Sequence, residues 1–169
     1  MKNKILIMGL PKSGKSTVLE RLISGIPNKK GFLTKEITIG GIRKGFKIVA
    51  SDGKEKVLAS VDFNTQYKVS KYHVDLKGFE EILNEFFSFS KNDILYIDEI
   101  GQMELFSEKF KELVLLYMNS DNFFIGTLSK VYQDSFTKSL IQRKDIEVIE
   151  ITPENREAEY QGLKSNLEK

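Results

Sequence analysis

The chain alternates short, continuous runs of apolar residues with segments in which apolar positions recur every three or four residues. The first pattern is typical of strands buried on both faces, and the second predicts amphipathic helices. We expect core strands at residues 4–8, 94–97 and 123–127, and a strand near a sheet edge at 146–151, where the pattern partly alternates. We expect helices at 15–24, 75–89, 107–118 and 132–142, and a last helix that begins with Thr152-Pro153, with the proline at its favoured first position.

Residues 32–61 have a different pattern. Short segments rich in Phe, Ile and Val at 31–37, 45–49 and 56–61 are separated by Gly40-Gly41 and Asp52-Gly53. Because Asp-Gly between such segments is a strong hairpin signal, we expect a small antiparallel β meander inserted into the alternating chain.

Strands that alternate with helices predict an α/β fold of three layers, with a mostly parallel sheet covered on both faces. We expect residues 1–169 to form a single domain. In such sheets a ligand binds at the carboxyl ends of the strands, so the segments that follow residues 8, 98 and 127 should meet at one place.

The composition narrows the choice of partners. The 169 residues include 26 Lys and Arg against 24 Asp and Glu, a net charge of +2 that gives little reason to expect nucleic acid binding. The chain contains no cysteine, and no apolar run approaches the roughly 18 residues of a membrane span. We therefore expect a cytoplasmic protein without a membrane or nucleic acid partner, and nothing in the composition indicates an oligomer.

The first predicted strand leads directly into a phosphate-binding loop, G-x-x-x-x-G-K-[ST]. Its glycines allow backbone N–H groups to surround an anion, and the following helix adds the positive end of its dipole. Lys15 would reach the β- and γ-phosphates, and the Ser16 hydroxyl would bind Mg²⁺. The loop residues are Gly9, Leu10, Pro11, Lys12, Ser13, Gly14, Lys15 and Ser16.

An acidic pair follows the second core strand, in what we expect to be the loop Asp98-Glu99-Ile100-Gly101. Downstream of a phosphate loop, this position predicts that Asp98 holds Mg²⁺ and that the loop lies beside the nucleotide. Glu99 could orient a water for attack on the γ-phosphate, or it could pair with a nearby cation. Thr127, which ends the third core strand, could sense the γ-phosphate or cap the next helix.

These segments resemble the thermophile-type nucleoside-triphosphatases, whose animal members are called cancer-related nucleoside-triphosphatases. The resemblance rests on the phosphate loop with Thr17 after it, on the Gly-Phe-Leu-Thr-Lys-Glu-Ile segment at 31–37 continued at 41–46, on the acidic segment 98–105, and more weakly on 152–156. The chain departs from the family at Gln102, where Lys is common, and at residues 10–13, where Pro-Pro-Gly-Val is typical.

The resemblance implies a RecA-like P-loop sheet with the antiparallel insertion near the active site. It implies Mg²⁺-dependent hydrolysis of nucleoside triphosphates to diphosphate and phosphate, with a loose preference for the base. It also counts Thr17 among the nucleotide-binding residues.

Hydrolysis of a γ-phosphate is assisted by a cation that meets the developing charge. Arg43 lies in a glycine-flanked turn and could serve as an arginine finger, or it could be an exposed hairpin residue. Asn155 and Arg156 could contact the base, or they could belong to the start of the last helix. Arg143 is a third candidate for this cation, but no motif around it supports the role. The single histidine, His73, is expected to be structural.

Two other functions remain open from the sequence. A small-molecule kinase would need an acceptor pocket and a lid rich in arginine, whereas this chain has only Arg21, Arg43, Arg143 and Arg156, unclustered. A nucleotide-dependent switch would act slowly on a protein partner, but the guanine-specific pattern Asn-Lys-x-Asp is absent.

Overall fold

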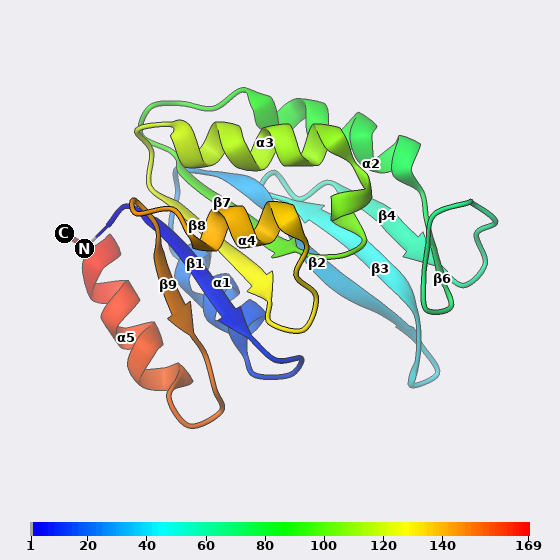
Figure 1. The fold of residues 1–169 in the computed structure, drawn as a ribbon, viewed down its shortest axis with the longest axis horizontal. Coiled ribbons are helices and arrows are strands. Elements are labelled where there is room, and N and C mark those ends of the chain that lie inside the picture. Colours follow the sequence, from blue (N-terminus) through cyan, green and yellow to red (C-terminus); the bar gives the residue numbers. More distant parts are fainter. Residues whose placement is uncertain (1) are drawn as a thin grey trace.

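The computed structural model describes residues 2–169, which form one sheet with helices on both faces (Figure 1). The strands are β1 (Lys4–Gly9), β2 (Lys29–Ile39), β3 (Ile42–Ala50), β4 (Glu55–Ser60), β5 (Lys68–Val69), β6 (Tyr72–Val74), β7 (Ile94–Ile100), β8 (Phe124–Ser129) and β9 (Glu147–Glu150). The α-helices are α1 (Lys15–Ser24), α2 (Leu76–Leu83), α3 (Glu108–Asn119), α4 (Ser135–Ile141) and α5 (Arg156–Leu167), and the 3₁₀ turns are η1 (Asn84–Phe87) and η2 (Glu104–Phe106).

The sheet order is β5-β6-β4-β3-β2-β7-β8-β1-β9. The strands from β2 to β9 in this order run parallel, and β3, β4, β6 and β5 add antiparallel strands beyond β2. The predicted meander is present but continuous with the central sheet. Residues 29–32 of β2 pair in parallel with β7, and residues 32–39 pair antiparallel with β3. As predicted, the segment at 146–151 forms a strand, β9, at a sheet edge.

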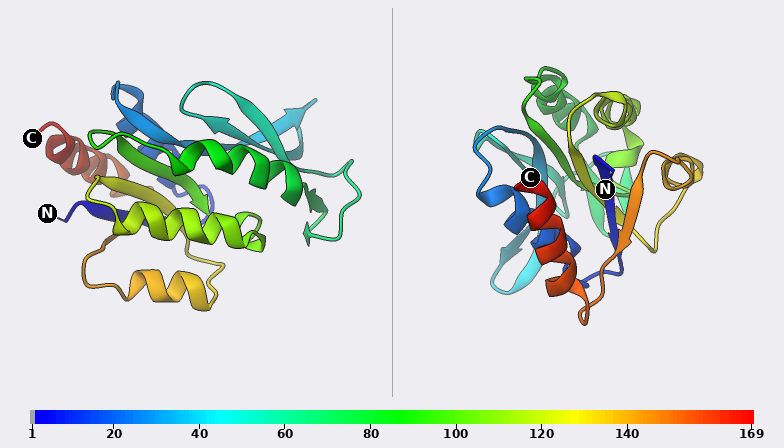
Figure 2. Two further views of the ribbon diagram at one scale, coloured as in Figure 1. Left: turned by 90° about the horizontal axis from the view of Figure 1, so that it is seen from above. Right: turned by 90° about the vertical axis from the view of Figure 1, so that its left-hand side faces the viewer.

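Two separate apolar cores cover the two faces of the sheet because successive strand residues point in opposite directions. In β1, Leu6 packs toward α2, α3 and α4, whereas Ile5 and Ile7 pack toward α1 and α5. The view along the sheet shows these two groups of helices on opposite sides of it (Figure 2). The structure therefore has the three layers that the alternating pattern predicts.

Several element boundaries differ from the predictions. The predicted helix at 75–89 is α-helical only to Leu83 and continues as the 3₁₀ turn η1. The predicted helix at 132–142 starts at Ser135, because Asp134 forms a capping box with Thr137. By contrast, Ser107 caps α3 as predicted, and its hydroxyl accepts a hydrogen bond from the Phe110 N–H.

Two further boundaries affect the site. The predicted loop that begins at Asp98 is wrong, since β7 continues through Asp98 and Glu99 to Ile100. The prediction that Pro153 occupies the first position of the last helix is also wrong. Pro153 lies in a turn closed by Thr152 and Asn155, whose backbone N–H groups donate to each other's side chains, and α5 begins at Arg156.

The topology brings the carboxyl ends of β1, β7 and β8 side by side. The loop from β1 to α1, the turn after β7 and the segment after β8 therefore meet at one edge of the sheet, as predicted. The β2–β3 hairpin extends past that same edge (Figure 1). No helix within residues 2–169 has the length and apolar character needed to cross a bilayer.

Candidate active site

The phosphate loop connects β1 directly to α1. Gly14 stands just before the helix with φ of 102°, in the left-handed region that favours glycine. A Cβ at Gly14 would lie 2.9 Å from Cδ of Arg156, so a larger residue would clash as well. Lys12 also has a positive φ, 64°, which gives the loop a second turn of the same hand. Leu10, Pro11, Lys12 and Thr17 are exposed, whereas Gly9 and Ser13 are buried.

Three hydroxyl and carboxyl side chains from different elements meet behind the loop. Ser16 Oγ in α1 lies 2.9 Å from Asp98 Oδ1 in β7, and Thr127 Oγ1 in β8 lies 2.6 Å from the same oxygen. Asp98 is only 2% exposed, and burial raises the pKa of its carboxyl to about 6. The structure thus brings together the two predicted metal ligands, Ser16 and Asp98.

This oxygen donor set fits Mg²⁺. The ion is held in nucleotide sites by one or two protein oxygens together with substrate phosphates, and a hydroxyl beside a buried carboxyl supplies that combination. Among the residues described, no group of three or more His, Cys, Asp or Glu side chains forms a denser metal site. Thr127 does not cap the following helix, because Asp134 does so.

Glu99 lies beside the loop lysine. Lys15 Nζ is 3.1 Å from Glu99 Oε2, and the two side chains are 10% and 29% exposed. A cation at the start of α1 therefore contacts a carboxylate near the end of β7. The structure shows the cation pairing that the sequence left open for Glu99. Ile100 turns into the core, and Gly101 starts the turn into η2.

The sequence analysis did not select Glu104 as a site residue. This side chain in η2 is only 4% exposed, and Thr34 Oγ1 in β2 lies 3.4 Å from its Oε1. Burial, followed by the charge of Glu99, raises the pKa of the Glu104 carboxyl to about 8. In the sequence, Glu104 is marked only by its two apolar neighbours, Met103 and Leu105, and this pattern does not predict that the carboxyl group is buried.

A cleft of about 540 Å³ separates the phosphate loop from the hairpins on the antiparallel side of the sheet. Arg43 lies on its wall, where Nε donates to the Tyr72 hydroxyl at 2.9 Å and Nη1 donates to Glu36 Oε1 at 3.0 Å. With three cations and one acid, the lining carries an excess of positive charge. The lining residues are Pro11, Lys12, Glu36, Arg43, Ser70, Lys71 and Tyr72.

Residues 155 and 156 have different roles in the structure. The Asn155 amide is used within its own turn, since Oδ1 accepts from the Thr152 N–H at 2.7 Å and Nδ2 donates to the Glu150 carbonyl at 2.8 Å. These bonds agree with the second of the two roles considered for Asn155, that it belongs to the start of the last helix. Arg156, in contrast, lies against the backbone of Gly14 and so borders the phosphate loop.

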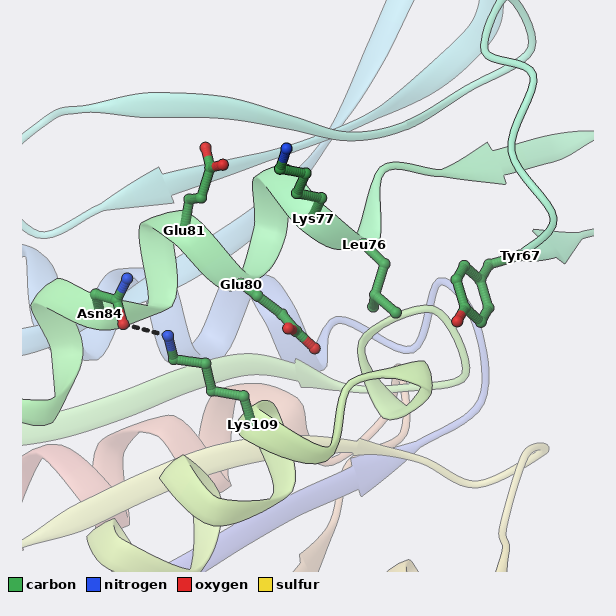
Figure 3. A pocket seen from close by; sticks show the side chains of 7 residues that line it. All are labelled: Tyr67, Leu76, Lys77, Glu80, Glu81, Asn84 and Lys109. Carbon is green, nitrogen blue, oxygen red and sulfur yellow. Dashed lines mark hydrogen bonds between the residues drawn. The ribbon is translucent and has the colours of Figure 1, made fainter.

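Arg143 and His73 lie apart from this site. Arg143 pairs with Asp145 at 2.6 Å near the amino-terminal ends of the strands, and His73 Nδ1 is 2.8 Å from the Thr65 carbonyl. A further hollow of about 460 Å³ lies between α2 and the start of α3 (Figure 3). Its lining contains none of the predicted site residues; it consists of Tyr67, Leu76, Lys77, Glu80, Glu81, Asn84 and Lys109.

A phosphate loop between strand and helix, bonded through its serine to an acid on a buried strand, defines a P-loop nucleoside-triphosphate-binding protein. The chain belongs to the NTPase family, whose sequence model matches residues 4–163. It is 40% identical over 157 residues to nucleoside-triphosphatase THEP1 of Thermotoga maritima, a match that covers 90% of this chain and 88% of the relative.

Two solved structures share the fold. THEP1 from the hyperthermophile Aquifex aeolicus superposes with a TM-score of 0.88 at 31% identity, covering 98% of this chain and 99% of that one. A human cancer-related nucleoside triphosphatase superposes with a TM-score of 0.81 at 28% identity, covering 97% and 96%. These comparisons confirm the predicted family, the fold class and the enzyme class, a nucleoside-triphosphatase.

Proposed function

We propose that this protein hydrolyses nucleoside triphosphates to diphosphate and phosphate, with Mg²⁺ and with water as the acceptor, and that it tolerates different bases. The observation that carries the proposal is the contact of 3.1 Å between Lys15 and Glu99, next to Asp98 bonded to Ser16. This contact supports the proposal because a carboxylate able to accept a proton lies beside the lysine to which we assign the γ-phosphate.

In this proposal Lys15 leaves Glu99 for the β- and γ-phosphates, because a multiply charged phosphate is the stronger partner. Its departure leaves the Glu99 carboxylate free to accept a hydrogen bond from water. As the water oxygen bonds to the γ-phosphorus, its proton passes to Glu99 and the bridging oxygen leaves with the diphosphate. Ser16 and Asp98 would hold Mg²⁺, which when bound neutralises charge on the phosphates.

Arg43 supplies charge from the opposite wall. Its guanidinium lines the cleft that also borders Pro11 and Lys12 of the loop, and its present carboxylate partner, Glu36, is exposed. Exposed ion pairs contribute little stability, so a γ-phosphate can replace Glu36. We propose that Arg43 stabilises the negative charge that develops on the γ-phosphate during hydrolysis.

Broad base tolerance is supported by the position of Arg156. A guanidinium that lies beside Gly14 of the loop offers a stacking surface, and every base has a π-face to place on it. Stacking reads no hydrogen-bond pattern, so it does not select among bases. We assign Thr127 to the support of Asp98, because its hydroxyl donates a hydrogen bond to Asp98 Oδ1.

One observation favours a second candidate function, a small-molecule kinase. The cleft has room for an acceptor, and Lys12, Arg43 and Lys71 would suit an acceptor that carries a phosphate. In that case Glu99 would accept the proton of an acceptor hydroxyl in place of water. The two functions differ in whether phosphate is released when no acceptor is added.

The test is phosphate release from ATP, GTP, CTP and UTP, with Mg²⁺ or with EDTA and without an acceptor. We expect release from all four with Mg²⁺ only. Glu99→Gln should lower kcat by about 10²-fold or more while nucleotide binding is retained, as general-base losses do. The matched control is Glu108→Gln, whose side chain is 82% exposed in α3. Near-normal hydrolysis by Glu99→Gln would remove Glu99 from this role, and release only with an added acceptor would favour the kinase.

A further inference from the structure

A second buried carboxyl group lies next to Glu99. Glu104 is almost completely enclosed at the start of η2, and its recorded polar partner is the Thr34 hydroxyl at 3.4 Å. Within residues 2–169, no Lys, Arg or His forms an ion pair with it. An ionised carboxylate in such a place would be costly, so the group is stable there as the neutral acid.

Gly101 shows how the two carboxyl groups are oriented. A Cβ built on Gly101 would lie 2.7 Å from Glu99 Oε1 and 3.0 Å from Glu104 Oε2. One oxygen of each carboxyl group therefore lies within 3.0 Å of the same point, beside a residue that has no side chain. Glu99 Oε2, the other oxygen, is the one that contacts Lys15.

The arrangement gives each carboxyl oxygen a separate neighbour. In Glu99, Oε2 contacts the loop lysine and Oε1 lies near the point that a Cβ of Gly101 would occupy. In Glu104, Oε2 lies near that same point and Oε1 accepts a hydrogen bond from Thr34 in β2. A neutral acid beside a carboxylate has a proton to donate, and such charge-assisted hydrogen bonds are short and strong. With one oxygen bonded to Thr34 and the other near Gly101, Glu104 lies between the central sheet and Glu99.

We propose that Glu104 is a positioning residue for hydrolysis: as a carboxylic acid it donates a hydrogen bond to Glu99 Oε1 and holds that carboxylate toward the water after Lys15 has turned to the nucleotide. The inference rests on the proposed role of Glu99. It assigns Glu104 no contact with the substrate, so its loss should lower kcat and leave nucleotide binding unchanged.

Two substitutions at Glu104 separate positioning from packing. Glu104→Gln keeps the shape and an N–H donor, and we expect kcat to stay within about threefold of the wild type. Glu104→Met keeps the volume but has no donor, and we expect kcat to fall about 10- to 100-fold, the usual effect of losing a supporting hydrogen bond. KM and the Kd for a non-hydrolysable triphosphate analogue should change less than about twofold in both.

A double-mutant cycle tests whether Glu104 acts through Glu99. If it does, Glu99→Gln/Glu104→Met should hydrolyse no more slowly than Glu99→Gln alone. An undiminished Glu104→Met effect in the Glu99→Gln background would overturn the proposal. Equal losses of kcat in Glu104→Gln and Glu104→Met would also overturn it, as would full activity of Glu104→Met.

The outcomes distinguish the two hypotheses. Phosphate release only with an added acceptor contradicts the proposed function, and full activity of Glu99→Gln contradicts the role of Glu99 on which this inference rests. Loss of activity in Glu99→Gln with full activity in Glu104→Met contradicts only the positioning role of Glu104. Should Glu104→Met fail to fold, Thr34→Val removes the hydroxyl that orients Glu104 and leaves the acid in place. We then expect kcat to fall about threefold or more at constant KM, and an unchanged kcat would overturn the proposal.

Discussion

The two walls of the cleft are built in opposite ways. On the loop wall, Pro11 and Lys12 line the cleft, and behind the loop the side chains of Ser16, Asp98 and Thr127 from three elements are joined by hydrogen bonds. On the hairpin wall, Arg43 and Glu36 form an exposed pair, braced from inside by Tyr72. The loop wall is therefore set by the packing of the sheet, whereas the ion pair of the hairpin wall can exchange partners at little cost.

This difference suggests that the two walls have different roles in the reaction. In the proposed mechanism Lys15 moves on the loop wall, whereas Ser16, Asp98 and Thr127 are already held together, and such preorganisation is where electrostatic catalysis gains most. On the hairpin wall, Arg43 is paired with the exposed Glu36, so its guanidinium can turn to a nucleotide once one is bound. Substitutions on the loop wall should therefore abolish turnover, while those on the hairpin wall should reduce kcat and leave the bound state intact.

The largest effect is expected at the centre of the loop wall. Lys15→Ala removes the cation for the β- and γ-phosphates, and we expect phosphate release to fall by at least about 10³-fold. Circular dichroism and the melting temperature should show a folded protein, because the Glu99 partner left behind is partly exposed. Substantial turnover in Lys15→Ala would mean that the catalytic phosphate site lies elsewhere.

The second prediction concerns the hairpin wall. Arg43→Ala should lower kcat about 10²-fold with KM changed less than about threefold, because the arginine acts on charge that develops during the reaction. The kcat of Arg43→Lys should lie between that of Arg43→Ala and that of the wild type. Arg143→Ala is the matched control, since that arginine pairs with Asp145 at the far edge of the sheet. Equal effects in the two alanine variants would argue against a role for Arg43 in the reaction.

The contrast between the walls also explains what the sequence could predict. The phosphate loop is local in the sequence, and its partnership with Asp98 follows from the convergence of parallel strands. Both could therefore be read from spacing and apolar pattern. Glu104 could not, because its burial depends on a 3₁₀ turn that folds back toward Glu99 and on β2, seventy positions earlier in the chain.

The errors in element boundaries have a similar cause. Asp98 and Glu99 look like loop residues because they are charged, but pairing between β7 and β8 extends past them to Ile100 and Leu128. Pro153 looks like the start of a helix, but the side chain of Asn155 closes a turn first. In each case a tertiary or side-chain hydrogen bond overrides the local preference.

The third prediction uses pH to test the buried acid of the loop wall. Its pKa of about 8 means that Glu104 loses its proton as the pH rises through that value, which adds a negative charge facing Glu99 and Asp98. We expect kcat of the wild type to fall about tenfold between pH 8 and pH 9.5, while Glu104→Gln stays level. A parallel decline in both proteins would assign the alkaline limb to another group.

The same group makes a prediction for stability, with a defined sign. The pKa of Glu104 is about 8 in the folded protein and 4.5 ordinarily, so the folded state binds the extra proton between these values. The free energy of unfolding contributed by this group is therefore highest below about pH 4.5 and falls until about pH 8. As the pH rises from about 4.5 to about 8, the melting temperature of the wild type should fall relative to that of Glu104→Gln.

The smallest effect is expected where the last helix touches the loop wall. Arg156→Ala removes a stacking surface worth about 1 kcal/mol at an exposed site, so KM should rise about fivefold for ATP, GTP, CTP and UTP alike, with kcat unchanged. Arg21→Ala, which breaks an exposed pair with Glu157 on the same face, serves as the control and should leave KM unchanged. A rise in KM for one base only would replace stacking by a specific contact. An equal rise for all four would instead support base tolerance through stacking on Arg156, which lies beside Gly14 at the start of α5, the helix that packs on α1.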